Sequence, residues 1–285
     1  MMYELLYNPL SSRGKNAKVA RELEKMLAKQ DFLVRTQNLL TIKDVDAFVQ
    51  SLTKDHKVVI IGGDGTLHRI VNSVNLSLIV CEVYLYRAGS GNDFIRSLEQ
   101  KGQFIKINDY LKTFPTLTTE HGKSLMINGA GIGLDGMVCA RVNRSKELKN
   151  KSNYFKNALI SFFKFKPVSA EIMIDGQMIS EKKLWFATTM YAAYFGGGMK
   201  IAPLKQRLDG KIQLVLVKDI PRWLLLVIFP TIYLGWHRFF KRFVNIYDAN
   251  EVSVKITEPS YLQVDGEDQY PVSGYHVIFK DKTPL

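Results

Sequence analysis

A glycine-rich turn with one carboxylate follows a short apolar run in this sequence. The run Val58–Ile61 leads directly into Gly62-Gly63-Asp64-Gly65-Thr66, after which Ile70, Val71 and Val74 recur at helical spacing. This order predicts a strand, a turn and a helix. Amides at such a turn and at the following helix N-terminus favour anions, and glycines let a phosphate approach the main chain closely. We therefore expect phosphate binding here, with Asp64 supplying a carboxylate for Mg²⁺ or a hydroxyl group.

Two other loops carry short polar side chains at comparable places. One contains Asn8-Pro9 with Ser11 and Ser12, and the other reads Ser90-Gly91-Asn92-Asp93. A small hydroxyl or amide in such a loop can hydrogen-bond a ribose or a phosphate. The alternative is an Asx-type turn that caps the next helix, and both interpretations can hold together.

A third candidate for chemistry lies near the C-terminus, in Val264-Asp265-Gly266-Glu267-Asp268. A carboxylate that follows a glycine turn can project into a cleft, and partial burial would make Glu267 a better general base. Asp265 and Asp268 flank it, so assignment of the role to one residue is partly conventional. Taken alone, the tripeptide is more typical of a hairpin turn.

Strands and helices alternate along the first part of the chain. The expected strands cover 3–8, 32–36, 57–61 and 80–86, and the expected helices cover 14–29, 43–54 and 67–74. Such alternation predicts a parallel doubly wound domain. Ligands of these sheets lie at the carboxyl ends of the strands, where all three polar or glycine-bearing loops of this part fall.

From about residue 103 the pattern changes to short segments of alternating hydrophobicity, which indicate an antiparallel sheet or sandwich. The segments are 104–108, 169–176, 185–191, 211–217, 251–256 and 275–280, with helices expected near 153–165 and 222–240. We predict two domains, 1–118 and 119–285. The sequence leaves open whether the last strand returns to the first domain.

The net charge of +12 favours an acidic partner. Basic residues mix with bulky apolar ones at 141–166 and at 236–243, which suits an anionic lipid surface or, alternatively, core helices with a solvated basic face. We expect no nucleic-acid partner, because no such motif is visible. The apolar run 223–236 is short for a membrane span and contains Pro230. Two cysteines and no signal-peptide pattern favour the cytoplasm.

The chain resembles the diacylglycerol kinase catalytic-domain family, which includes bacterial lipid kinases and sphingosine and ceramide kinases. The resemblance runs nearly end to end, and seven segments occur in family order. They are Tyr7–Lys15, Gly62–Val74, Ala88–Leu98, Ile127–Val138, Tyr194–Pro203, Arg207–Lys211 and Val264–Glu267.

The resemblance implies a fold and a reaction. The fold is an α/β N-terminal doubly wound nucleotide domain, of the NAD kinase or phosphofructokinase type, followed by a C-terminal β-rich sandwich domain. The reaction is transfer of the ATP γ-phosphoryl group to the hydroxyl of diacylglycerol or a similar lipid, at the cleft between the domains. By motif match, Glu267 is the general base, and Asp64 organises nucleotide and metal and can assist catalysis.

The resemblance also implies ATP and Mg²⁺ as cofactors and assigns their contacts. The nucleotide positions are Asn8, Pro9, Ser11, Ser12, Thr36, Gly62, Gly63, Asp64, Gly65, Thr66, Leu67, His68, Ser90 and Asn92. A structural Mg²⁺ is expected on the Asp209 side chain and the carbonyls of Gln206 and Lys211, which are oxygen ligands of a suitable kind. Without the resemblance, a turn before the strand at 211–217 is the better interpretation.

The sequence departs from the family pattern at four places, one of which is a pair of residues. His68-Arg69 stands where Asn-Glu is common, Ser12 where glycine is usual, and Met190 where Asn is common. Leu208 replaces the first of two aspartates before Gly210, which weakens the case for the structural Mg²⁺.

Three hypotheses about function therefore remain open. The leading one is a cytoplasmic lipid kinase, peripherally bound to the inner face of an anionic membrane. The second is a soluble small-molecule kinase of the NAD kinase type. The third is a catalytically silent lipid- or nucleotide-binding regulator, which the departures at His68, Arg69 and Leu208 motivate. The sequence also leaves open whether the chain forms a homodimer.

Overall fold

A computed structural model describes residues 1–87, 92–98, 100–145 and 151–280. The chain divides into two compact units, Met1–Thr113 and Phe114–Leu285. The predicted boundary at residue 118 falls inside a strand of the second unit, β6 (Thr116–Thr119).

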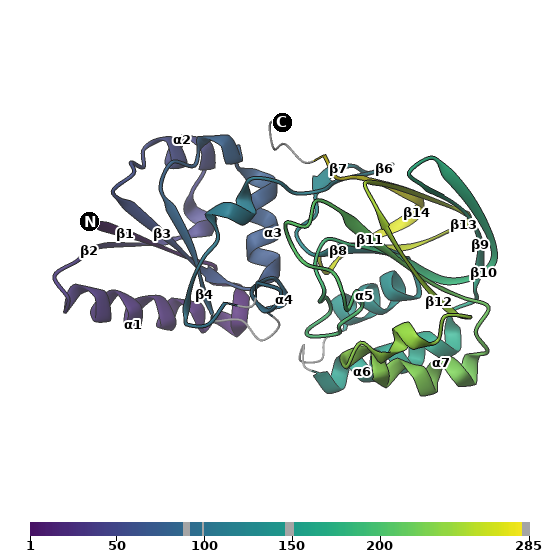
Figure 1. Ribbon diagram of the computed structural model, residues 1–285. Coiled ribbons are helices and arrows are strands. Elements are labelled where there is room, and N and C mark those ends of the chain that lie inside the picture. Colours follow the sequence, from purple (N-terminus) through teal and green to yellow (C-terminus); the bar gives the residue numbers. More distant parts are fainter. Residues whose placement is uncertain (88–91, 99, 146–150, 281–285) are drawn as a thin grey trace. The chain divides into compact units, whose positions relative to one another are not determined.

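The first unit is built on a five-stranded sheet of order β2-β1-β3-β4-β5, seen edge-on in Figure 1. Its strands are β1 (Met2–Tyr7), β2 (Leu33–Asn38), β3 (His56–Gly62), β4 (Glu82–Arg87) and β5 (Phe104–Lys106). The first four are parallel, and β5 is antiparallel to β4. The β-branched run Val58–Ile61 is buried on both faces of the sheet, as a central parallel strand requires.

Helices cover both faces of this sheet, so the doubly wound prediction is confirmed. On one face, α1 (Asn16–Ala28) buries Ala20, Leu23 and Leu27 against Leu5 and Val59. On the other face lie α2 (Val45–Gln50) and α3 (Asp64–Ser73), which with Leu6, Val58 and Ile60 line an apolar cavity. A fourth helix, α4 (Asp93–Arg96), is a single turn.

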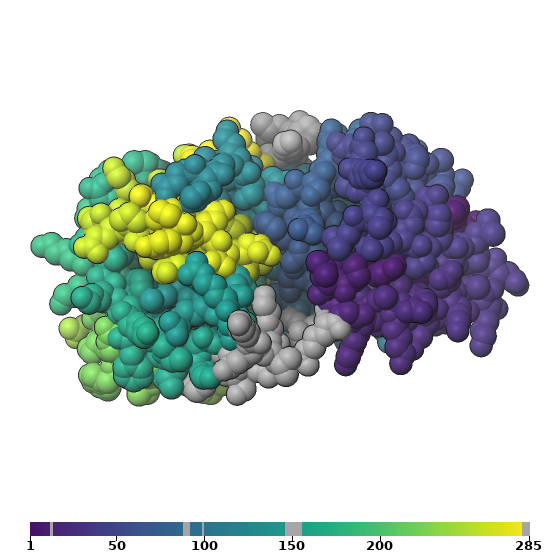
Figure 2. Space-filling view, turned by 180° about the vertical axis from the view of Figure 1, so that it is seen from behind, coloured from purple at the N-terminus to yellow at the C-terminus, as the bar shows by residue number. Residues whose placement is uncertain are grey.

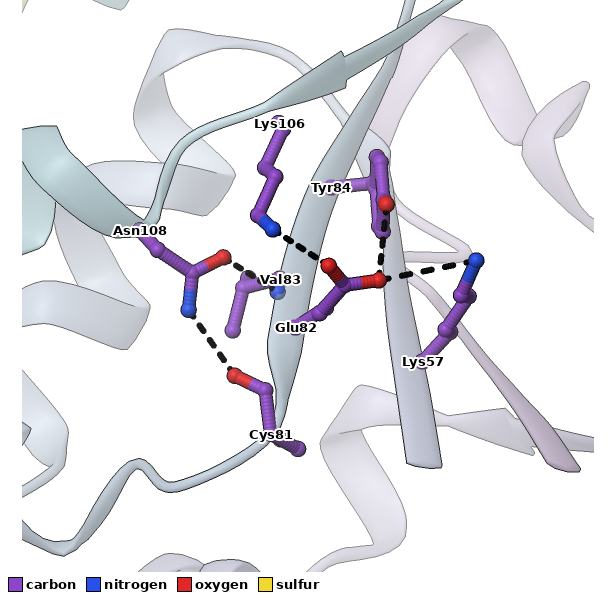
Figure 3. Close-up of polar contacts among 7 residues, drawn as sticks. All are labelled: Lys57, Cys81, Glu82, Val83, Tyr84, Lys106 and Asn108. Atoms are coloured by element: carbon purple, nitrogen blue, oxygen red, sulfur yellow. Dashed lines mark hydrogen bonds and ion pairs between the residues drawn. The ribbon is translucent and has the colours of Figure 1, made fainter. Parts of the chain in front are cut away.

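A polar cluster holds the edge strand β5 to the amino end of β4 (Figure 3). Glu82 accepts hydrogen bonds from Lys106 and from the Tyr84 hydroxyl (2.9 Å), and Lys57 lies 3.5 Å away. The hydrogen bond from Lys106 is the main reason that the pKa of Glu82 falls to about 2. Asn108 bonds the main chain on either side of Glu82, at 2.8 Å each. This cluster lies at the opposite end of β4 from its carboxyl-end loop, and it is structural.

The second unit contains a nine-stranded sheet of order β12-β11-β10-β8-β13-β14-β6-β7, in which β9 pairs with β10 and β13. The remaining strands are β7 (Gly122–Leu125), β8 (Gly129–Gly133), β9 (Val168–Ile174), β10 (Gln177–Met190), β11 (Ile212–Lys218), β12 (Val244–Ala249), β13 (Glu251–Val264) and β14 (Glu267–Ile278). The last strand, β14, pairs with β13 and β6, and its yellow residues adjoin blue-teal ones in Figure 2. It therefore stays in the second sheet and does not return to the first unit.

Helices α5 (Leu134–Arg144), α6 (Lys151–Lys164) and α7 (Arg222–Ile228) pack with the sheet around one apolar core. The helix predicted over 222–240 is wrong as a single element, because it breaks into α7 and two short 3₁₀ helices, η5 (Phe229–Tyr233) and η6 (Trp236–Phe239). Pro230 cannot donate the helical hydrogen bond, and Gly235 turns the chain with φ of 72°. Among the described helices, none is long and apolar enough to cross a membrane.

Candidate functional site

The loops after β1 and β3 meet at the side chain of Thr66. Asn8 Nδ2 donates to Thr66 Oγ1 at 3.0 Å, and the Ser11 hydroxyl lies 2.9 Å from the same oxygen. Gly62 makes this approach possible, because a Cβ there would lie 2.6 Å from the Thr66 side chain. The structure thus brings together three of the residues expected to contact the nucleotide.

The outer face of the turn is open. Among the described residues, and apart from its chain neighbours and its own helix backbone, a Cβ on Gly63 or Gly65 would meet no atom within 4 Å, so these glycines leave space where another residue type would place a side chain. The turn opens α3, a helix of 10 residues, whose N-terminal dipole favours an anion. This geometry fits a phosphate group.

Asp64 ties the third loop to the glycine turn. Its carboxylate accepts hydrogen bonds from the amides of Asp93 (3.0 Å) and Phe94 (2.8 Å), which begin α4. Asn92 precedes them in the left-handed conformation, with φ of 51°. Asp64 therefore caps a helix 29 residues away, and it fixes the loop of Asn92 beside the turn.

The remaining nucleotide candidates lie in several environments. The Thr36 hydroxyl donates to Glu24 of α1 at 2.9 Å, and Leu67 is buried in the core. His68 is partly exposed on α3, and Pro9 is partly exposed in the first loop. Ser90 and the side chain of Ser12 fall outside the described residues.

In the second unit, Asp265 and Gly266 form the two-residue hairpin turn between β13 and β14, with φ of 52° and 93°. Both residues are of the types that tolerate positive φ in a type I′ turn. The Asp265 carboxylate accepts hydrogen bonds from the amides of Ile127 (2.7 Å), Asn128 (2.7 Å) and Gly129 (3.0 Å). The hairpin is thereby fixed to the start of β8.

The three acidic residues of this hairpin have different surroundings. Asp268 accepts a hydrogen bond from Asn143 (2.9 Å) and lies 3.5 Å from Arg144, both on α5. Glu267 is exposed in this unit. Within the described ranges, no hydrogen bond or ion pair engages the Glu267 carboxylate, which is thus available for a ligand.

Sequence reasoning missed a buried carboxylate, Asp135, in the first turn of α5. It accepts hydrogen bonds from the Thr188 hydroxyl (2.8 Å) and the Gly136 amide (2.9 Å). Burial raises its pKa to about 6, in spite of these hydrogen bonds. An aspartate placed between a glycine-rich strand and a helix was the signal that could have identified it.

The turn expected to hold a structural Mg²⁺ contains an ammonium group instead. Lys205 Nζ donates to the carbonyl oxygen of Gln206 (2.5 Å) and to Oδ1 of Asp209, and the Lys211 amide donates to the same carboxylate oxygen (3.2 Å). In the described part of the chain, no three His, Cys, Asp or Glu side chains gather in a metal-binding group. These residues do not fit a divalent cation while Lys205 occupies their oxygens.

Arg207 connects this turn to the segment that Asp265 holds. Its guanidinium is buried and donates to the carbonyl oxygen of Ile127 (2.5 Å) and to Asn128 Oδ1. The segment is thus held through its amides by Asp265 and through its acceptors by Arg207. Arg207 begins one of the seven family-like segments, but the motif predicted no role for its side chain in the site.

Two family models match this chain. The model of the diacylglycerol kinase catalytic domain matches residues 3–122. The model of the YegS C-terminal NAD kinase beta sandwich-like domain matches residues 129–277, and this second match alone covers more than half of the chain. The α/β unit and the β-rich unit therefore define a two-part kinase fold. The chain belongs to the diacylglycerol kinase catalytic-domain family, and the resemblance seen in its motifs is confirmed.

Similar proteins agree with this assignment. The diacylglycerol kinase of Mycobacterium tuberculosis (strain ATCC 25618 / H37Rv) is 26% identical over 222 residues, covering 75% of this chain and 68% of that protein. The diacylglycerol kinase of Bacillus subtilis (strain 168) is 23% identical over 277 residues, covering 92% and 88%. A solved diacylglycerol kinase structure from Bacillus anthracis str. Sterne has a TM-score of 0.66 at 17% identity, covering 98% and 93%, and shows the shared fold.

Proposed function

We propose that this protein transfers the γ-phosphoryl group of ATP to the hydroxyl of diacylglycerol or a similar single-hydroxyl lipid. The observation that carries the proposal is the separation of roles in the Asp265–Asp268 hairpin. Asp265 and Asp268 are held by main-chain and side-chain donors, whereas the Glu267 carboxylate is left for a substrate. Membership of the lipid kinase family supports the same assignment.

In the proposed reaction, Glu267 accepts the proton of the lipid hydroxyl as its oxygen attacks the γ-phosphorus. A new oxygen–phosphorus bond forms, the bond to the β-phosphate oxygen breaks, and ADP leaves. The open turn at Gly63 and Gly65 binds the phosphates of the ATP–Mg²⁺ substrate, where fixed dipoles offset the negative charge. Asp64 acts by holding Asn92 and α4 in place beside that turn.

Transfer of label from γ-labelled ATP to lipids in mixed micelles tests this proposal. The panel contains diacylglycerol, monoacylglycerol, a sphingoid base, ceramide and phosphatidylglycerol, with NAD as a soluble acceptor. We expect label in diacylglycerol or one close relative. Label in NAD without micelles would favour the soluble kinase, and intact ATP binding with no labelled acceptor would favour the silent regulator.

A second part of the proposal concerns membrane docking at the inner face of an anionic membrane. We define the docking surface as exposed apolar side chains of α6, α7 and η6 and of Leu234, which directly follows η5, together with nearby basic residues. The apolar members are Phe163, Trp223, Val227, Leu234, Trp236 and Phe239, and the basic ones are Lys164, Arg238, Lys241 and Arg242. α6 and α7 lie side by side in Figure 1, and Arg222 of α7 donates to the Phe165 carbonyl just after α6.

The composition of this surface supports a lipid partner. Trp223 is 67% exposed and Trp236 is 56% exposed, which is unusual for such large aromatic side chains. No acidic residue occurs between Arg222 and Phe243. Aromatic and basic side chains together suit the boundary between acyl chains and anionic headgroups.

Binding to vesicles containing phosphatidylglycerol is expected to weaken as salt rises from about 0.05 to 0.5 M, because salt screens the basic residues. Trp223→Ala combined with Trp236→Ala should lower vesicle affinity at least about tenfold, since two buried aromatic groups are lost. Met178→Ala is the matched control, because Met178 is 62% exposed on the hairpin between β9 and β10. Co-sedimentation with vesicles measures the binding of the wild type, of the double tryptophan variant and of Met178→Ala. Equal binding by these three proteins would exclude this surface as the docking site.

A small apolar cavity beneath the docking surface suggests where an acyl chain enters. It is lined by α5, α6, α7 and the sheet, with Asp135 in its wall, and has a volume of about 50 Å³. Because an acyl chain is larger than this cavity, the proposal requires α6 and α7 to move outward when the protein is docked.

A further inference from the structure

The buried ammonium of Lys205 lies at two of the three oxygens expected to bind a structural Mg²⁺. It donates to the Gln206 carbonyl and to the Asp209 carboxylate, and its side chain is fully buried. Lys205 also lies 5.7 Å from the centre of the Tyr191 ring, whose face attracts a cation. Burial lowers the pKa of the Lys205 ammonium, and Asp209 and Asp248 oppose this effect by favouring the charged form.

A divalent cation and this ammonium cannot share the same oxygens, because their charges would repel at contact distance in a poorly solvated place. Mg²⁺ takes oxygen ligands in near-octahedral geometry, and the ammonium occupies two of the protein oxygens that it would use. Leu208 stands where the family commonly has an additional aspartate, and its backbone adopts φ of 64°. The turn thus has a single carboxylate, Asp209, and the Lys205 ammonium donates to it.

We propose that the Lys205 ammonium replaces the structural Mg²⁺ in this chain, as a cation supplied by the polypeptide itself. The turn from Lys205 to Lys211 then keeps its shape without a divalent metal. This inference concerns the stability of the second unit, and it holds or fails independently of the proposed kinase reaction.

The replacement has a consequence for the candidate base. The turn carries Arg207, which holds the Ile127–Asn128 segment, and Asp265 binds the amides of the same segment. Glu267 is two residues beyond Asp265. The turn that contains Lys205 is thus joined, through Arg207 and the Ile127–Asn128 segment, to the hairpin that carries Glu267.

The proposal is tested by thermal unfolding of this chain without nucleotide, once in EDTA and once in about 10 mM Mg²⁺. We expect the wild type to have the same unfolding temperature in both solutions. Lys205→Ala should unfold at a lower temperature in EDTA and regain about 3 °C or more in Mg²⁺, because the vacated oxygens can accept a hydrated cation. Lys205→Met should be destabilised without any response to Mg²⁺, because its side chain still fills the space.

Lys218→Ala is the matched control. Lys218 pairs with the buried Glu181 in the same unit, so its loss should lower stability with no response to Mg²⁺. A Lys205→Ala variant that ignores Mg²⁺ would overturn the proposal. So would stoichiometric Mn²⁺ binding to the nucleotide-free wild type, seen by electron paramagnetic resonance and lost in Asp209→Asn, and this measurement does not depend on whether Lys205→Ala folds.

Discussion

Glu267→Gln is expected to lower kcat for lipid phosphorylation about 10³-fold, while ATP binding stays unchanged. Glutamine keeps the size and polarity of the side chain but cannot accept the hydroxyl proton at neutral pH, and general bases typically contribute about 10²–10⁴-fold. Steady-state transfer of labelled phosphate measures the rate, and ATP affinity is measured separately. The thermal transition should not move, because Glu267 is exposed and none of the described residues bonds its carboxylate.

Glu258→Gln provides the matched control, since Glu258 is an exposed glutamate on β13, the strand that leads into the same hairpin. It should retain wild-type kcat. A Glu267→Gln variant with more than about a tenth of the wild-type kcat would exclude Glu267 as the general base, since such a loss is below the usual range. Attention would then move to Asp135, the buried carboxylate with a raised pKa.

Asp265→Ala is expected to destabilise the second unit by about 4 kcal/mol and to lower kcat as well. The change leaves the amides of Ile127, Asn128 and Gly129 without their acceptor, and hydrogen bonds to a charged group contribute about 1.5–3 kcal/mol each, not additively. It also places alanine at φ of 52°, where Asp and Asn are tolerated better. Urea unfolding followed by near-ultraviolet circular dichroism measures the stability of this unit.

Asp175 provides a matched control for Asp265, because its carboxylate makes the same kind of contacts in a hairpin that does not carry the candidate base. It lies at φ of 46° in the hairpin between β9 and β10, and its carboxylate accepts hydrogen bonds from the amides of Asn250 (2.9 Å) and Glu251 (2.8 Å). Asp175→Ala should cost stability but leave kcat unchanged. If Asp265→Ala and Asp175→Ala lower kcat equally, the effect is general destabilisation and Asp265 does not position Glu267.

Local patterns predicted much of this fold because the interactions behind them are local. The apolar run Val58–Ile61, the glycine turn and the helical spacing of Ile70, Val71 and Val74 are close in sequence, and they form β3, the turn and α3. Alternating hydrophobicity likewise located β9, β10, β11, β13 and β14 of the second unit. It missed β6, β7, β8 and β12, and the predicted segment 104–108 was wrong for this unit because it forms β5 of the first sheet. The helix expected over 222–240 was wrong, because its composition was apolar enough while Pro230 and Gly235 interrupted its hydrogen bonds.

The features of the site also fall into two groups, those that the sequence predicted and those that required the tertiary structure. By itself, the sequence determined the family, the two-part fold, the open glycine turn and the acidic hairpin, because each depends on residue types a few positions apart. Only the tertiary structure decided which hairpin carboxylate is available and what cation the turn at Asp209 holds. Those answers depend on the amides of 127–129, on α5 and on the buried Lys205 side chain, whose contacts follow from chain packing and burial rather than from spacing.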